Sequence, residues 1–192
     1  LTVAESDSIG AAGVQADIKT ILALGGYATT ALSAVAAQNT SGTEYLHVLE
    51  AGFVAQQMRV VLEDIGTDSI KTGTLINKDI VNAVGDVLDE YAHKNIPVVV
   101  DPSIVARRGE QLLDDEAIAA LKRRLFIRAS VLTPNLREAE LLTGVRIRDI
   151  DDMRHATNMM RTLGTEAIVL KAGQAFSEKS VYLVAIGSEE RM

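Results

Sequence analysis

Short runs of consecutive apolar residues alternate along the chain with longer segments whose apolar positions recur every three or four residues. Runs of this kind are typical of strands covered on both faces, and the wider spacing is typical of amphipathic helices. The runs predict strands over residues 1–6, 27–35, 69–72, 97–100, 130–133 and 166–171. The wider spacing predicts helices over residues 12–24, 51–64, 78–93, 115–125, 136–142 and 151–163. Strand and helix alternate, which predicts an α/β fold: a doubly wound, mostly parallel sheet with helices on both faces.

Two further segments are less regular. Residues 45–49 are compatible with a short edge strand. Residues 174–186 have an apolar spacing that we interpret as an amphipathic helix.

The length of 192 residues and the apolar content of 47% predict a single domain over residues 1–192. The 26 acidic and 19 basic residues are mixed along the chain and give a net charge of −7, which argues against binding to nucleic acid or an anionic membrane. Two short basic clusters, Arg107-Arg108 and Lys122 to Arg124, are expected on solvated surfaces or at helix ends.

The absence of cysteine excludes disulfides and thiolate metal sites. No apolar run approaches the roughly 20 residues of a membrane span, and the first residues have no signal-peptide pattern. These features predict a cytoplasmic protein.

Polar residues and glycines follow the predicted strands, where ligands bind in sheets of this kind. They are Asp7, Gln38, Gly73, Thr74, Asp101, Asn135 and Gly173. Turn residues are common at strand ends for purely structural reasons, but a repeated choice of Asp, Asn and Gln favours a ligand site.

The small residues from Gly10 to Gly13 open the first predicted helix, where unpaired N–H groups favour an anion or a polar ring. By itself such a segment is more often a tight turn. Asp17 lies on the same helix face as Gly13 and could accept hydrogen bonds from a heteroaromatic amino group, or it could be a surface acid. Gln38 carries donors and an acceptor suited to a ring edge, although it could also stabilise a turn.

Several segments occur in an order that carries a resemblance. They read SD..GAAG.QADIKT, AQNT, K.G.L, VVVDP, TPNL.EAE.L.G and VLKAG, and they extend from the N-terminus to Gly173. In this combination the chain resembles the hydroxymethylpyrimidine/phosphomethylpyrimidine kinase family of thiamine biosynthesis. The resemblance implies a ribokinase-like fold, ATP with Mg²⁺, phosphorylation of an aminopyrimidine alcohol and its monophosphate, and a homodimer.

The resemblance also implies roles for single residues. Asp17 and Gln38 match polar contacts to the pyrimidine, with Ala12 and Ala36 beside the ring. The positions that organise Mg²⁺, its waters and the nucleotide phosphates are matched by Asp101, Asn135 and Glu138, with Lys171 and Gly173 near the nucleotide. Magnesium prefers oxygen ligands and commonly keeps waters, which suits this set. As alternatives, Asp-Pro and Pro-Asn pairs also begin loops, and Glu138 could be a first-turn helix acid.

The chain departs from the family pattern at several positions. Glu5 stands where glycine is usual, Thr74 where methionine is common, and Ser103 where valine is common. Outside this group, Ser8 replaces a proline, and Ala172 and Gln174 replace a glycine and a histidine. We expect Glu5, Thr74 and Ser103 to make the substrate pocket more polar, which leaves a pyridoxal-type vitamin kinase as an alternative.

Ribokinase-like enzymes carry a Gly-Thr-Gly-Cys or Gly-Ala-Gly-Asp turn that stabilises the transferring phosphate, and neither occurs in this sequence. We therefore expect a stretch after about residue 174 to be deleted or not visible, and we assign no catalytic base. A non-catalytic pyrimidine-binding protein on the kinase fold is a second alternative. His47, His93 and His155 lie far apart and predict no metal site.

Overall fold

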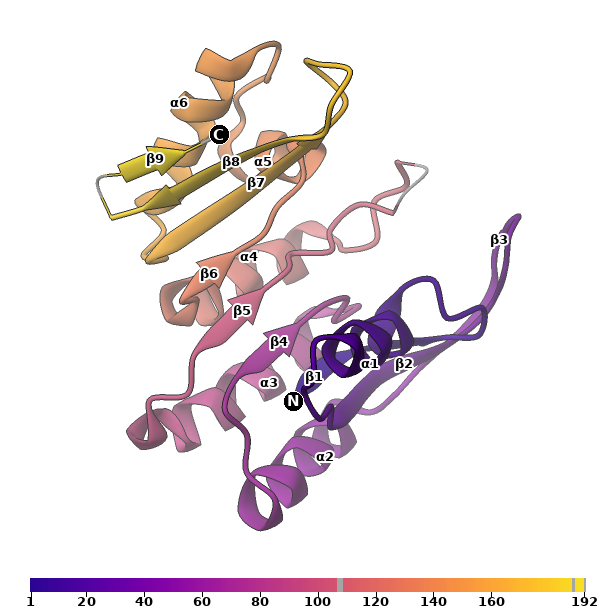
Figure 1. Cartoon of the computed structure of the whole chain (residues 1–192). Coiled ribbons are helices and arrows are strands. Elements are labelled where there is room, and N and C mark those ends of the chain that lie inside the picture. The colour runs from indigo at the N-terminus through magenta and orange to yellow at the C-terminus, as the bar shows by residue number, and fades with distance from the viewer. Residues whose placement is uncertain (107–108, 188, 192) are drawn as a thin grey trace.

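The computed structural model describes residues 1–106, 109–187 and 189–191 (Figure 1). In this part of the chain the strands form one sheet in the order β3-β2-β1-β4-β5-β6-β7-β8-β9. The strands are β1 (Thr2–Asp7), β2 (Thr30–Asn39), β3 (Gly42–Val48), β4 (Ile70–Thr72), β5 (Val98–Val100), β6 (Val131–Leu132), β7 (Ala167–Gly173), β8 (Val181–Ile186) and β9 (Glu189–Arg191). The α-helices are α1 (Gly13–Ala23), α2 (Ala51–Asp64), α3 (Lys78–Glu90), α4 (Asp115–Arg124), α5 (Leu136–Thr143) and α6 (Ile150–Arg161), with 3-10 turns at Ala92–Lys94 and Phe126–Arg128.

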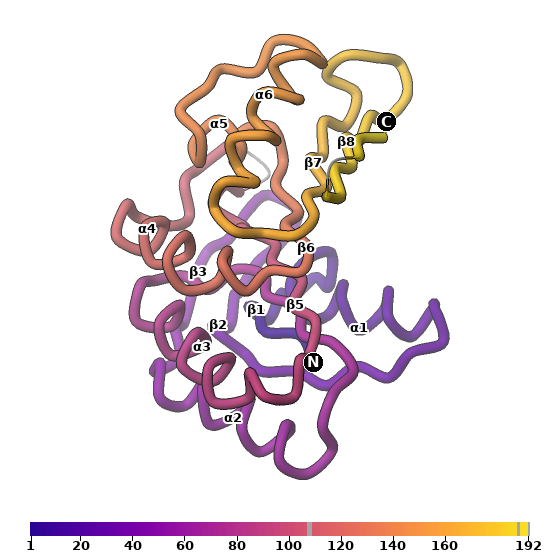
Figure 2. The backbone as a smooth tube through the Cα atoms, turned by 90° about the vertical axis from the view of Figure 1, so that its left-hand side faces the viewer, coloured from indigo at the N-terminus to yellow at the C-terminus, as the bar shows by residue number. Residues whose placement is uncertain are grey.

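The centre of the sheet is parallel. β2, β1, β4, β5, β6 and β7 run in the same direction, whereas β3, β8 and β9 pair antiparallel at the two sides. From β1 the chain moves to β2, toward one edge of the sheet. From β4 through β5 and β6 to β7 it moves toward the other edge. Because such crossovers are right-handed, α1 lies on one face and α2 to α6 lie on the other (Figure 2). The predicted fold class is confirmed.

Side-chain caps fix where several helices begin. Asn77, Asp114 and Asp149 precede α3, α4 and α6, and each side chain accepts a backbone N–H from the first turn. Such caps satisfy donors that have no partner inside the helix. At the other end of α5, Gly144 has a φ of 74°, a left-handed conformation that glycine adopts without strain. These local signals explain why the predicted helices agree with the structure to within a few residues.

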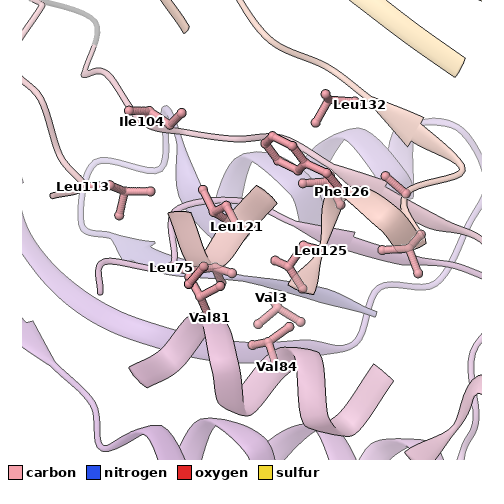
Figure 3. Close-up of a cluster of buried hydrophobic side chains, with 14 of the residues drawn as sticks. Val3, Leu75, Val81, Val84, Ile104, Leu113, Leu121, Leu125, Phe126 and Leu132 are labelled. Atoms are coloured by element: carbon pink, nitrogen blue, oxygen red, sulfur yellow. The ribbon is translucent and has the colours of Figure 1, made fainter. Parts of the chain in front are cut away.

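The main core lies between the sheet and the layer of α2 to α6. Figure 3 shows side chains from β1, β6, α3 and α4 meeting there, among them Val3, Val84, Leu121 and Leu132. On the opposite face, half-buried valines of β5, β6 and β7 alternate with the core residues. The helical layer therefore fixes the positions of the parallel strands.

Residues 174–186 do not form the expected helix. Residues 174–180 lead from β7 into β8, which pairs antiparallel with β7 through Leu170 with Leu183 and Ile168 with Ala185. Leu183 and Ala185 are buried and their neighbours in β8 are more exposed, so the period is two rather than three to four. Pairing to a neighbouring strand decided a segment whose apolar pattern was ambiguous.

Other boundaries differ less. β2 ends at Asn39, beyond the predicted end at residue 35, so that Gln38 lies inside the strand rather than after it. β3 forms the edge strand that residues 45–49 indicated and pairs with this extension of β2. Lys122 to Arg124 form the last turn of α4, as expected, whereas Arg107 and Arg108 lie outside the described residues. In the described ranges, no helix has the length and apolar character needed to cross a membrane.

The contrast between two adjacent residues tests the position of the core. Phe126 is fully buried and Ile127 is 56% exposed. Phe126→Ala should lower the free energy of unfolding by about 3–5 kcal/mol because it leaves a cavity. The matched control, Ile127→Ala, should lower it by less than about 1 kcal/mol. Urea unfolding of both variants measures the difference, and equal losses would contradict this description of the core.

Candidate active site

The loop after β1 is organised by a buried carboxylate. Asp7 is 2% exposed, and its oxygens accept the backbone N–H groups of Ile9 at 3.1 Å, Ala11 at 2.9 Å and Ala12 at 2.8 Å. The chain then enters α1 at Gly13, whose φ is 57° and where a Cβ would collide with the carbonyl oxygen of Glu5. Asp7 therefore holds the small-residue turn in one conformation, a role that the sequence analysis did not assign to it.

Gln38 is tied to the same loop. Its backbone N–H donates to the Ser8 hydroxyl at 2.7 Å, and that hydroxyl donates to the Gln38 carbonyl at 2.6 Å. The side-chain carbonyl of Gln38 accepts the Thr43 hydroxyl at 2.6 Å. The β2–β3 hairpin, which carries Gln38, projects at the edge where the parallel strands end (Figure 1).

Asp17 lies elsewhere. The Lys71 ammonium donates to both of its carboxylate oxygens, at 2.9 and 2.8 Å, and the Thr2 hydroxyl donates to one of them. Thr2 is the first residue of β1, and Asp7 is the last. Asp7 pairs with Ala36 of β2, and Gln38 lies two residues further along β2. At about 3.3 Å per residue, the two levels are roughly 20 Å apart along the strands. The structure does not bring Asp17 and Gln38 together as expected, and Asp17 instead fastens α1 to β1 and β4.

A second polar cluster joins the ends of β5, β6 and β7. One oxygen of Asp101 accepts the Lys171 ammonium at 2.8 Å and the Thr133 hydroxyl at 3.2 Å. The other oxygen accepts the hydroxyl of Ser103 at 3.2 Å and its backbone N–H at 3.3 Å, and Ser103 has a left-handed φ of 44°. Residues far apart in the sequence are thus assembled around one carboxylate, as the strand-end pattern predicted.

Asn135 and Glu138 start α5 as a reciprocal pair. The Asn135 side chain accepts the Glu138 N–H at 3.0 Å, and one Glu138 oxygen accepts the Asn135 N–H at 2.9 Å. The other oxygen accepts the Ile104 N–H at 2.9 Å, and Glu138 is only 1% exposed. Burial, together with the nearby negative charge of Asp101, raises the pKa of the Glu138 carboxyl above its ordinary value. Glu138 is therefore the first-turn helix acid that was given as its alternative role, and any contact with a ligand would be additional.

The remaining predicted substrate residues flank the turn between β1 and α1. Ala36 is buried and pairs with Asp7, while Ala12 precedes α1. β4 pairs with β1 so that Gly73 lies against Ala4, which brings Thr74 level with Glu5. One carboxylate oxygen of Glu5 is buried and has no hydrogen-bond partner among the described residues.

The two clusters offer different chemistry. Gly173 ends β7 beyond Lys171, at the same edge as Asp101. No group of three or more His, Cys, Asp or Glu side chains in the described ranges is placed to hold a metal ion. Asp101 with Glu138 nearby still fits Mg²⁺, because this ion accepts oxygen ligands and is commonly held through waters and phosphate oxygens. The β5–β7 cluster therefore suits a metal-bound polyphosphate, and the β1–β2 region suits a small polar ring.

The mostly parallel α/β sheet is that of small-molecule kinases with a ribokinase-like fold, the class to which the similar solved structures belong. The sequence profile described as phosphomethylpyrimidine kinase matches residues 7–191, so the chain belongs to this family.

A relative and two solved structures agree with this assignment. The hydroxymethylpyrimidine/phosphomethylpyrimidine kinase of Bacillus subtilis is 42% identical over 173 residues, which are 90% of this chain and 63% of that protein. The crystal structure of phosphomethylpyrimidine kinase from Clostridium difficile 630 is 33% identical with a TM-score of 0.90, covering 99% of this chain and 81% of that one. Pyridoxal kinase from Staphylococcus aureus, in complex with AMP-PCP, is 32% identical with a TM-score of 0.86 and covers 98% and 68% of the two chains. The chain thus spans less than two thirds of the length of the B. subtilis relative.

The raised pKa of Glu138 gives a pH-dependent stability that can be measured. The folded state holds the proton more tightly than the unfolded state, so the free energy of unfolding should fall as the pH rises from the ordinary value of 4.5 through the raised folded pKa. Glu138→Gln should lose this slope, and at low pH it should be less stable than the wild type by about 1–3 kcal/mol because an amide NH₂ replaces one acceptor.

Urea unfolding from about pH 5 to about pH 7 tests this expectation, since the difference between the two proteins should narrow as the pH rises. An unchanged slope in the variant would contradict it.

Proposed function

We propose that the protein is an ATP- and Mg²⁺-dependent kinase that phosphorylates 4-amino-5-hydroxymethyl-2-methylpyrimidine and its monophosphate. Family membership supports the reaction class. The single observation that carries the proposal is the Asp101–Lys171 pair, with its 2.8 Å contact at the joined ends of β5 and β7. It places an anion able to attract a metal ion next to a cation able to attract phosphate.

The phosphate half of the site uses the second cluster. Lys171 would neutralise charge on the nucleotide phosphates, with Asn135 and Gly173 beside them. Asp101, with Glu138 behind it, would hold Mg²⁺ through its waters. When bound, such an ion neutralises charge on the transferring phosphoryl group. The Thr133 hydroxyl keeps Asp101 oriented when the ammonium of Lys171 turns to phosphate.

The substrate half lies at the β1–α1 turn. Gln38 would read the ring edge, because its position in the projecting hairpin lets its amide face a ring seated against the loop fixed by Asp7. Ala12 and Ala36 leave room for the ring, and Thr74 and Ser103 add hydroxyl groups around the pocket. Asp17 supports this half indirectly, by holding α1 in place.

Two other readings stand beside the main proposal. The polar residues Glu5, Thr74 and Ser103, with the likeness to a pyridoxal kinase complexed with AMP-PCP, favour a pyridoxal-type vitamin kinase. A non-catalytic pyrimidine-binding protein on the kinase fold is the second of these readings. Turnover with each alcohol separates the first from the main proposal, and binding without ADP release would identify the second.

The proposal also includes the organisation of the protein. Residues 1–192 would act as one ribokinase-like domain of a cytoplasmic homodimer. Sedimentation of the full-length protein tests the assembly, because a dimer and a monomer differ twofold in mass.

An activity assay tests the role of Asp101. The full-length protein should release ADP when given Mg-ATP and the hydroxymethylpyrimidine, and Asp101→Asn should lower kcat by about 100-fold because the metal-organising charge is lost. Asp86→Asn is the matched control, since the Asp86 side chain is 60% exposed on α3 and should leave kcat unchanged. Full activity of the Asp101 variant would contradict the assigned phosphate half.

Binding of the pyrimidine tests the role of Gln38. Gln38→Ala should weaken affinity by about 1–3 kcal/mol, because ring polar atoms lose their partner while the fold is retained. Gln56→Ala, on an exposed position of α2, should bind like the wild type. Isothermal titration measures both, and equal affinities would place the ring elsewhere.

A further inference from the structure

Ser103 has an uncommon backbone conformation beside the second polar cluster. Its φ is 44°, and among the described residues other than glycine only Ile76 and Asn95 also have a positive φ. A left-handed conformation is unfavourable for a residue with a Cβ, and it persists only where the surrounding structure imposes it. The contacts of Ser103 and of its neighbours therefore show what this conformation achieves.

The chain is fixed on both sides of Ser103. Before it, the Asp101 N–H donates to the Thr72 carbonyl at 3.0 Å and joins the end of β5 to β4. After it, the Ile104 N–H donates to a Glu138 carboxylate oxygen at 2.9 Å, and the Ile104 side chain is fully buried. Because both flanks are anchored, Ser103 cannot relax into an ordinary conformation without moving one of them.

In this conformation two donors of one residue converge on the same oxygen. The Ser103 hydroxyl and backbone N–H lie 3.2 and 3.3 Å from Oδ1 of Asp101. Pro102 has no N–H, so Ser103 is the first residue after Asp101 that can offer both donors. Neither contact is short, but together they restrict the rotation of a carboxylate whose torsion is intrinsically broad. Oδ2 is left to Lys171 and Thr133.

The hydroxyl of Ser103 matters because the backbone supplies little to Asp101. Asp7 accepts three backbone N–H groups and Glu138 accepts two, whereas Asp101 accepts one. The Asp101 side chain is also 24% exposed, so that solvent or a ligand can reach it. Ser103 thus orients the carboxylate without covering it.

We propose that Ser103 is a positioning residue, which holds Asp101 in the orientation that magnesium-bound nucleotide phosphates require. It acts through Asp101 and touches neither the ion nor the phosphates. This inference rests on the proposed function and deepens it. Outer contacts that orient a metal-organising group commonly change metal affinity strongly when they are removed.

Titration of the full-length protein with AMP-PCP, in Mg²⁺ and separately in EDTA, tests the proposal. Ser103→Ala removes the hydroxyl and keeps a Cβ at the left-handed position. Ser103→Gly also removes the hydroxyl but relieves the backbone, and Ser103→Thr keeps a hydroxyl. The matched control is Ser130→Ala, because the Ser130 hydroxyl accepts the N–H of Val98 at the other end of β5.

Ser103→Ala should bind AMP-PCP in Mg²⁺ about 10-fold more weakly than the wild type, because Asp101 loses one of its two contacts at Oδ1. In EDTA the same variant should bind AMP-PCP like the wild type. Ser103→Thr should recover part of the loss, and Ser130→Ala should bind like the wild type under both conditions.

Ser103→Gly separates positioning from stability. It should melt at a higher temperature than Ser103→Ala, because glycine adopts a positive φ without strain. It should nevertheless bind AMP-PCP in Mg²⁺ no better than Ser103→Ala. If affinity follows the melting temperature instead, Ser103 has a structural role only and the proposal is wrong.

The remaining outcomes distinguish this inference from the proposed function. Wild-type affinity of Ser103→Ala in Mg²⁺, or an equal loss in Mg²⁺ and in EDTA, would overturn the role of Ser103 and leave the proposed function standing. Failure of the wild type to bind AMP-PCP in Mg²⁺ would overturn the proposed function, and the inference about Ser103 with it.

Discussion

The parallel pairing of the central strands is the constraint on which the site depends. β1, β4, β5, β6 and β7 run in the same direction and are held by apolar side chains under one helical layer. Their last residues therefore meet at one edge of the sheet, whatever their separation in sequence. The contact between Asp101 and Lys171 is a direct result, because 70 residues separate the two partners along the chain. Local structure alone could not have joined them.

The carboxylates at this edge differ in which groups donate hydrogen bonds to them, and this difference separates structural from ligand-binding roles. Asp7 and Glu138 accept backbone N–H groups, which fix the loop before α1 and the start of α5. Asp101 instead accepts mainly side-chain donors, those of Lys171, Thr133 and Ser103, besides one backbone N–H. One oxygen of Glu5 is buried and has no donor among the described residues. Carboxylates that accept mainly backbone N–H groups keep the loops in place, and the other carboxylates remain available to ligands.

The separation between Asp17 and Gln38 changes how the substrate half is understood. A motif shared with a family suggests that its polar residues act at one place, but a helix that runs back along a strand carries its later residues away from the strand end. Asp17 is one turn beyond Gly13 and reaches the level of Thr2, where Lys71 neutralises it. The proposed substrate half therefore no longer includes Asp17, and Gln38 beside the turn that Asp7 organises is its polar group.

Local sequence was sufficient to predict the alternation of strands and helices, the helix starts and the set of polar strand ends, because each depends on residues close together in the chain. Asn77, Asp114 and Asn135 show this most clearly, since a cap acts within one turn of its own helix. Three features became clear only in the folded chain: residues 181–186 form a strand, β2 continues through Gln38, and Asp17 pairs with Lys71. Those features depend on a neighbouring strand or helix supplying the hydrogen bonds or the opposite charge, and one residue's pattern carries no information about which distant partner will be beside it.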